Sequence, residues 1–273
     1  MTRVPKILVF DSGLGGLTVF SQILRLRPNA NFVYCADDAG FPYGSWPEAE
    51  LSAHVVDTLA RLIFEHAPDM AVIACNTAST LVLPPLRARW PDLPFVGAVP
   101  AIKPAAERSQ SRKITVLATP GTVARDYTQQ LIDDFAAHCE VTLVGSKRLA
   151  GLAEDYMHGG AAQEAEIAAE IAPCFVASES GRTDAIVLAC THYPLLMDVF
   201  RRLAPWPVEW IDPAPAVAKR ADQLLAEKFG PDAPGSAPVS RRAQFTSGAA
   251  PEPALAATLE RFGLTTKKTR ATA

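Results

Sequence analysis

The sequence lacks the features that mark several specialised classes of protein. No apolar run approaches the roughly 18 uninterrupted residues of a membrane-spanning helix, so no membrane span is expected. The amino terminus lacks the charged-then-apolar pattern of a signal peptide, which makes a cytoplasmic location the default expectation. Basic residues are not in excess: 26 Lys and Arg stand against 29 Asp and Glu, and the formal net charge is -3. The composition therefore predicts no nucleic-acid partner.

Paired cysteine motifs are also missing. The chain has five cysteines, an odd number, and none is spaced as C-x-x-C. A disulfide framework and a zinc site are therefore disfavoured, and we expect no bound metal. Cys35, Cys139 and Cys174 lie in apolar or weakly patterned segments and are interpreted as structural thiols. The two remaining cysteines, Cys75 and Cys190, have polar neighbours and need a different explanation.

Short apolar runs alternate with helix-length segments along the 273 residues. The runs expected to be strands are 7–10, 32–36, 70–74, 95–99, 114–118, 141–144, 186–189 and 208–211. The segments expected to be helical include 47–67, 122–137, 163–178, 214–229 and 253–262. This alternation predicts the α/β class, with parallel sheets covered by helices on both faces.

Clusters of proline predict where the chain passes between domains. Prolines at 94, 100 and 104 interrupt any regular element, and a second interruption lies at 205–207. We predict a first domain of residues 1–98 plus 207–273 and a second domain of residues 99–206, so that the second is an insertion into the first. Residues 230–239 are expected to form a surface loop, and the end of the chain is expected to be frayed.

Two stretches nearly repeat each other. Asp69 precedes Cys75 by six residues across an apolar run, and Asp184 precedes Cys190 in the same way. Such a run is typical of a buried parallel strand, so each Cys is expected at a strand's carboxyl end, where α/β sheets place their ligands. The repeat suggests duplication: two similar domains related by a pseudo-two-fold axis, with the active site at their interface. Thiols presented from two sides suit removal of a proton from one face of a carbon and its return to the other.

The residues after each Cys differ. A helix is expected to begin at Cys75, and its N-terminal dipole is predicted to favour a thiolate there. Asn76 and Thr77 can donate hydrogen bonds to a bound carboxylate. After Cys190 come Thr191 and His192, and the imidazole can stabilise a thiolate or relay its proton.

A glycine-rich stretch follows the first predicted strand. Residues 10–19 read Phe-Asp-Ser-Gly-Leu-Gly-Gly-Leu-Thr-Val. A dinucleotide fingerprint requires glycine where Thr18 stands, and the Gly-Lys-Ser/Thr of a P-loop is absent. We expect a tight turn that opens a helix, with backbone N–H groups available to an anion such as a carboxylate. Asp11 and Ser12 project into the same crevice, and Tyr43 and Gly44, after the second strand, are candidate ligand contacts.

These motifs together resemble the glutamate racemases, of the cofactor-independent aspartate/glutamate racemase superfamily. The matching stretches are residues 10–19, 42–44, 74–80 (Ala-Cys-Asn-Thr-Ala-Ser-Thr), 99–101 and 188–195 (Leu-Ala-Cys-Thr-His-Tyr-Pro-Leu). The resemblance extends from Lys6 to about Gly248, and Gly145, Leu149 and Glu154 also fit it. The two cysteine motifs in full length are specific to this family, whereas the glycine-rich stretch is not.

The resemblance implies an amino-acid racemase (an isomerase) that uses no cofactor and supplies D-glutamate for peptidoglycan, hence for cell wall biogenesis and cell shape. It implies glutamate as substrate, a homodimer, and Cys75 and Cys190 as catalytic acid and base, Cys75 acting on D-glutamate and Cys190 on L-glutamate. Three residues would assist the thiols: Asp11, Glu154 and His192. The substrate-binding pairs would be Asp11-Ser12, Tyr43-Gly44, Asn76-Thr77 and Thr191-His192.

Three other functions remain open on the sequence. An aspartate racemase would have the same fold and thiols, although Thr191-His192-Tyr193-Pro194 favours glutamate. A Cys–His hydrolase could use Cys190 as nucleophile and His192 as base, but it leaves Cys75 unexplained. A two-lobed protein that binds an amino acid without catalysis is the third alternative.

Overall fold

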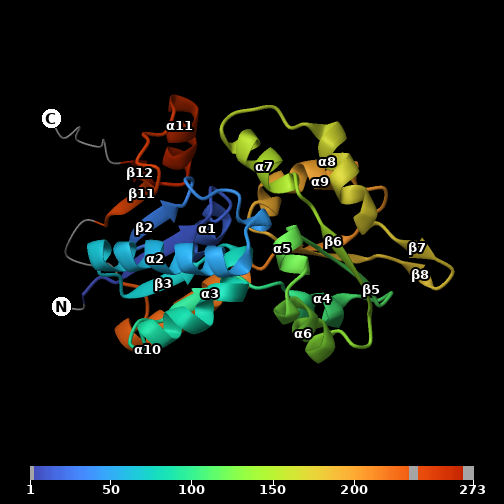
Figure 1. Ribbon diagram of the computed structural model, residues 1–273, viewed down its shortest axis with the longest axis horizontal. Coiled ribbons are helices and arrows are strands. Elements are labelled where there is room, and N and C mark those ends of the chain that lie inside the picture. The colour runs from blue at the N-terminus through green and yellow to red at the C-terminus, as the bar shows by residue number, and fades with distance from the viewer. Residues whose placement is uncertain (1–2, 234–238, 267–273) are drawn as a thin grey trace.

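The computed structural model describes residues 3–233 and 239–266, and within them the chain forms two lobes, each built on a parallel sheet (Figure 1). The larger sheet has six strands in the order β12-β11-β2-β1-β3-β4. Its strands are β1 (Lys6–Asp11), β2 (Asn31–Ala36), β3 (Met70–Ile73), β4 (Phe95–Gly97), β11 (Arg241–Phe245) and β12 (Thr265–Thr266). The carboxyl-terminal segment thus adds two strands beside β2, at one edge of this six-stranded sheet.

The second sheet has four strands in the order β10-β9-β5-β6, all parallel. They are β5 (Lys113–Ala118), β6 (Glu140–Gly145), β9 (Ala185–Ala189) and β10 (Glu209–Ile211). A small antiparallel pair, β7 (Ala177–Ser178) and β8 (Gly181–Arg182), extends from this lobe. The predicted α/β class with two parallel-sheet lobes is confirmed.

Helices cover both faces of each sheet, and alternate strand residues enter opposite cores. In the first lobe, Ile7 and Val9 pack towards α1 (Leu17–Leu26), α10 (Ala214–Phe229) and α11 (Pro253–Arg261). Leu8 and Phe10 pack on the other side, towards α2 (Glu48–His66) and α3 (Asn76–Arg89). Burial of both faces explains why these strands read as continuous apolar runs.

The second lobe repeats this arrangement around its shorter sheet. Leu117 and Leu188 face α7 (Leu149–Met157), α8 (Glu164–Ile171) and α9 (Met197–Leu203). Val116 and Val187 face α4 (Ile102–Arg108) and α6 (Asp126–Phe135) on the opposite side. The remaining short elements are α5 (Pro120–Val123) and the 3-10 turns η1 (Tyr43–Ser45), η2 (Ala172–Cys174) and η3 (Tyr193–Leu196).

Three sequence predictions need correction. The boundary at 206/207 places β10 in the first domain, but β10 pairs with β9, so the chain leaves the second sheet only after Ile211. The expected helix 122–137 is divided into α5 and α6, because Arg125 has an extended backbone conformation between them. The expected helix 163–178 ends at Ile171, where Pro173 opens a 3-10 turn. Residues from 207 onward otherwise contribute α10 and the edge strands of the first sheet.

The predicted surface loop 230–239 and frayed end lie partly or wholly outside the described residues. Within the described ranges, no helix combines the length and apolar character that crossing a bilayer requires. Over the same residues, no group of three or more His, Cys, Asp or Glu side chains is arranged to hold a metal ion.

Candidate active site

The two cysteines of the near-repeat lie at equivalent places in the two sheets. Cys75 follows β3 and is the N-cap of α3, and Cys190 directly follows β9. The Asp that begins each repeat secures the other end of its strand. Asp69 accepts a hydrogen bond from the backbone N–H of Lys6 at 2.9 Å. Asp184 accepts three hydrogen bonds at 2.6–2.8 Å, from Ser109 Oγ and from the backbone N–H groups of Gln110 and Ser111.

Both cysteines line one cavity of about 290 Å³, which is partly open to solvent. The cavity walls come from both lobes, because the carboxyl ends of the two sheets face each other. Residues from the first lobe are Ser12, Phe41, Pro42, Tyr43, Gly44, Ser45, Cys75, Asn76 and Thr77; those from the second are Thr119, Pro120, Ser146, Lys147, Ala150, Cys190 and His192. The predicted location of the site between the two lobes therefore matches this cavity, which has room for a small amino acid.

Cys75 lies in surroundings that keep it protonated. Its thiol is 5% exposed and points at Ser12 Oγ at 3.7 Å. Burial, together with the negative charge of Asp11, raises the pKa of Cys75 to about 12, and a backbone N–H from Ala78 offsets only part of this. The prediction that the α3 dipole favours a thiolate at Cys75 is therefore wrong. The free-energy cost of removing a thiolate from water exceeds the stabilisation that it gains from the helix dipole.

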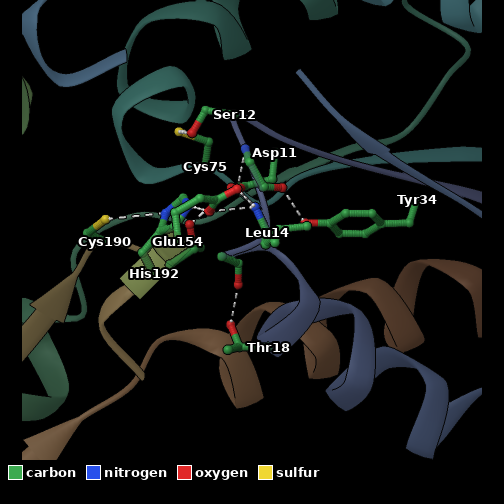
Figure 2. A network of polar contacts seen from close by, with 12 residues as sticks. Asp11, Ser12, Leu14, Thr18, Tyr34, Cys75, Glu154, Cys190 and His192 are labelled. Atoms are coloured by element: carbon green, nitrogen blue, oxygen red, sulfur yellow. Dashed lines mark hydrogen bonds and ion pairs between the residues drawn. The ribbon is translucent and has the colours of Figure 1, made fainter. Parts of the chain in front are cut away.

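Cys190 has a cationic neighbour instead. Its Sγ lies 3.9 Å from His192 Nδ1, and His192 Nε2 lies 2.8 Å from a carboxylate oxygen of Glu154 (Figure 2). Burial by itself lowers the pKa of His192, but the hydrogen bonds to Cys190 and Glu154 and the charges of Glu154 and Asp11 raise it well above its ordinary value. This rise favours the imidazolium form of His192, and a neighbouring imidazolium stabilises a thiolate.

The glycine-rich stretch brings the lobes into close contact at this point. The backbone N–H of Leu14 donates to both carboxylate oxygens of Glu154, at 3.1 and 3.2 Å (Figure 2). The anion that this turn holds is thus a carboxylate of the protein itself. A Cβ on Gly15 would lie 2.5 Å from His192 Nδ1 and 2.6 Å from its backbone N, so only glycine permits this approach.

Asp11 forms a second link between the lobes. One of its oxygens accepts from the hydroxyl of Thr191 at 3.0 Å and the other from the backbone N–H of Gly13 at 3.0 Å. Burial raises the pKa of Asp11, while the charge of His192 and these hydrogen bonds oppose that rise. Asp11, Glu154 and Thr191 lie behind the cavity wall rather than on it.

Asn76 and Thr77 present hydrogen-bonding groups at the start of α3. The side-chain oxygen and nitrogen of Asn76 are both buried, and neither has a hydrogen-bond partner within the described part of the chain. Thr77 shares its hydroxyl with Thr119 at 3.0 Å and with Thr122 at 3.2 Å, across the gap between the lobes. Burying an amide without a hydrogen-bond partner costs free energy, which indicates that Asn76 is placed to bind a polar ligand.

Sequence reasoning missed part of the cavity wall. Thr119 follows β5, and Ser146 and Lys147 follow β6. In the parallel register Ala118 is paired with both Gly145 and Ala189, so these residues and Cys190 leave three neighbouring strands at one level. Their position at the carboxyl ends of β5 and β6 is the sequence signal that marks these residues as candidate ligand contacts.

The fold consists of two α/β lobes that each bring one cysteine to a shared cavity, and comparison with known proteins identifies the family in which this arrangement belongs. A family model described as Asp/Glu/Hydantoin racemase matches residues 25–221. A glutamate racemase of Mesorhizobium japonicum is 53% identical over 267 residues, covering 98% of this chain and 100% of that protein. A glutamate racemase of Sinorhizobium medicae is also 53% identical, covering 96% of each chain.

Solved structures show the same likeness. The crystal structure of Escherichia coli glutamate racemase in complex with L-glutamate and the activator UDP-MurNAc-Ala is 36% identical, covers 97% of each chain and superposes with a TM-score of 0.86. The glutamate racemase of Aquifex pyrophilus is 27% identical over 94% of each chain, with a TM-score of 0.68. The chain belongs to the Asp/Glu/hydantoin racemase family, and within that family it groups with the glutamate racemases.

Proposed function

We propose that the protein interconverts L- and D-glutamate by passing the α-proton between Cys75 and Cys190 without a cofactor. The observation that carries this proposal is that both thiols line one cavity and come from equivalent strand ends of two lobes. A carbon held between them presents one face to each sulfur. The glutamate specificity is supported by relatives at 53% identity that cover nearly the whole chain.

In the direction from L to D, the Cys190 thiolate takes the α-proton. The C–H bond breaks, an S–H bond forms, and the electron pair passes onto the α-carbon and its carboxylate. The Cys75 thiol then releases its proton to the opposite face, leaving a thiolate on Cys75 and a thiol on Cys190. The reverse reaction exchanges the two roles. A raised pKa suits Cys75 to the acid role, and the His192 imidazolium suits Cys190 to the base role in this direction.

The α-proton of an amino acid is a very weak acid, so the site must stabilise the charge that develops on the carboxylate. Asn76 and Thr77 are positioned as donors, and losing one such donor typically costs about 2.7–4 kcal/mol of transition-state stabilisation. Ser12, Tyr43 and Gly44 complete the first-lobe wall of the substrate site. We assign Asp11, Glu154 and Thr191 to support behind the wall, where they orient the second-lobe residues.

The test replaces each cysteine by alanine and follows α-proton exchange in deuterium oxide. Cys75→Ala should abolish racemisation while Cys190 still exchanges the α-proton of L-glutamate with retention. Cys190→Ala should exchange only D-glutamate. Racemisation is followed by circular dichroism and exchange by NMR. If either variant racemises at a rate near that of the unaltered protein, the two-thiol mechanism is wrong.

The same assay with aspartate separates the aspartate racemase alternative, because a site shaped for glutamate should turn over aspartate far more slowly. A Cys–His hydrolase would form an acyl-enzyme on Cys190 and release a burst of product from an ester substrate. A racemase forms no such intermediate, so we expect no burst. Glutamate binding without α-proton exchange would instead identify a binding protein. The supply of D-glutamate for peptidoglycan, the homodimer and the cytoplasmic location are proposed from the family resemblance.

A further inference from the structure

A buried carboxylate lies beneath the first-lobe wall of the cavity and takes no part in the chemistry proposed above. Asp37 directly follows β2 and its side chain is 1% exposed. One of its oxygens accepts the hydroxyl of Tyr43 and also contacts His54 Nε2, at 2.5 Å. The other accepts the hydroxyl of Thr246 at 2.5 Å. Asp37 does not line the cavity, so its effect on a ligand must pass through a neighbour.

Tyr43 is the neighbour that reaches the cavity. Its ring is 2% exposed and packs edge-on against Trp46 and His54, with centroid separations of 6.2 and 6.1 Å. Burial and the adjacent charge of Asp37 raise the pKa of Tyr43 well above its ordinary value, so the phenol remains a proton donor. The hydrogen bond to Asp37 thus fixes the hydroxyl end of the ring, and Tyr43 is at the same time a residue of the cavity wall.

The chain passes close to this contact on two sides, at Gly40 and at Gly44. A Cβ on Gly40 would lie 2.7 Å from the Asp37 oxygen that holds Tyr43. A Cβ on Gly44 would lie 2.9 Å from the Cβ of Thr119, so the turn that carries Tyr43 is also pressed against the second lobe. Because Thr246 follows β11, the carboxyl-terminal segment takes part in holding this wall from outside.

We propose that Asp37 is a positioning residue for substrate binding: it anchors the Tyr43 hydroxyl and thereby holds the Tyr43-Gly44 wall at the distance that the substrate requires. This inference rests on the proposed function, since it concerns the affinity of the same cavity. It assigns no proton transfer to Asp37. The anchor acts on the wall equally in the ground state and the transition state, so its loss should raise KM and leave kcat nearly unchanged.

The experiment compares Asp37→Ala, Tyr43→Phe, the double variant and Asp37→Asn. Losing a hydrogen bond to a charged group should raise KM by about tenfold in Asp37→Ala and in Tyr43→Phe. The double variant should be no worse than Asp37→Ala by more than about twofold, since both changes remove one interaction. Asp37→Asn keeps a carbonyl oxygen for Tyr43 and a donor for Thr246, so its KM should stay within about threefold of the unaltered value.

Asp38→Ala is the matched control. Asp38 is the next residue along the chain and also accepts hydrogen bonds from Thr246 and Ser247, but it does not contact Tyr43. Its KM should be unchanged. KM effects that multiply in the double variant, or an Asp38→Ala effect as large as that of Asp37→Ala, would overturn the proposal. If Asp37→Ala does not fold, a wild-type KM in Tyr43→Phe refutes it instead.

Failure of this inference and failure of the proposed function give different results. The unaltered protein is assayed first, and absence of glutamate racemisation refutes the proposed function. In that case, crystal structures of Asp37→Asn and Asp37→Ala still test whether Asp37 holds the Tyr43 ring in place. A Tyr43 ring displaced in the alanine variant and retained in the asparagine variant supports it, and an unmoved ring in both overturns it.

Discussion

Replacing Glu154 by glutamine should separate the charge of this residue from its shape. The carboxylate bonds His192 Nε2 at 2.8 Å and the N–H of Leu14 at 3.1 Å, with side-chain exposures of 15% for Glu154 and 2% for His192. Glutamine can still accept from Leu14, but it removes the charge that raises the pKa of His192. A hydrogen bond to a charged group contributes on the order of 1.5–3 kcal/mol, so kcat/KM should fall by about 10- to 100-fold.

The pH dependence of this variant has a definite sign. In the unaltered protein the raised pKa keeps His192 charged well above pH 6.5, its ordinary value. In Glu154→Gln the pKa of His192 falls, so the imidazolium is lost at a lower pH and the alkaline decline of kcat/KM should move to lower pH. The stability that the pair contributes is fully present below about pH 6.5 and is lost as pH rises through the folded-state pKa. The variant's loss in free energy of unfolding should therefore be largest in acid.

Racemisation of each enantiomer, followed by circular dichroism between pH 6 and 9, provides the measurement. Because the enantiomers have equal free energies in water, kcat/KM must fall by the same factor in both directions. Asp155→Asn is the control: it removes the same charge from the next residue of α7, whose side chain is exposed. Unchanged kcat/KM and an unmoved alkaline limb in Glu154→Gln would refute the assignment of His192 as an imidazolium held by Glu154.

Three further changes test other parts of the site. Gly15→Ala places a methyl carbon 2.5 Å from His192 Nδ1, so urea unfolding should show a loss of about 1–3 kcal/mol; an unchanged midpoint would contradict the close packing. Iodoacetamide should label Cys190 before Cys75 in the substrate-free protein, because the pKa of Cys75 is about 12; mass spectrometry showing equal labelling would contradict this. Lys147→Met removes an exposed cation from the cavity rim, so KM should rise by about 1.5- to 5-fold and depend less on salt concentration. An unchanged KM would exclude a role for Lys147 in attracting the substrate.

The sequence was sufficient to predict the two sheets and the strand ends that line the cavity, because both depend on local pattern. Continuous apolar runs such as 70–74 and 186–189 identify strands buried on two faces. A polar residue directly after such a run lies at the carboxyl end of its strand. Strand β11, which lies between β2 and the edge strand β12, was not predicted. Its sequence, Arg-Arg-Ala-Gln-Phe, lacks an apolar run, and only Ala243 in it is buried.

Features that depend on contacts between distant segments could not be read in the same way. Glu154 and Leu14 are 140 residues apart, and neither the span of the Gly13–Gly16 turn nor its purpose is visible until the lobes are placed together. The thiolate prediction for Cys75 failed for the same reason. It counted the helix that follows the thiol and could not count Asp11, which lies behind the thiol and adds to the cost of burial.

The different surroundings of the two thiols determine which form of the enzyme predominates between turnovers. Burial and the charge of Asp11 raise the pKa of Cys75 to about 12, so the resting protein is expected with Cys75 protonated, in the form that accepts L-glutamate. Each L-to-D turnover leaves the opposite form, with the charge on Cys75 beside Asp11. That form is higher in free energy, so a proton must be redistributed before the next L-glutamate is accepted. Because kcat/KM is constrained to be equal in both directions, this asymmetry can appear only in kcat and KM separately. L- and D-glutamate should therefore differ in KM and kcat by one common factor, and identical values for both enantiomers would show that the two thiols are equivalent despite their surroundings.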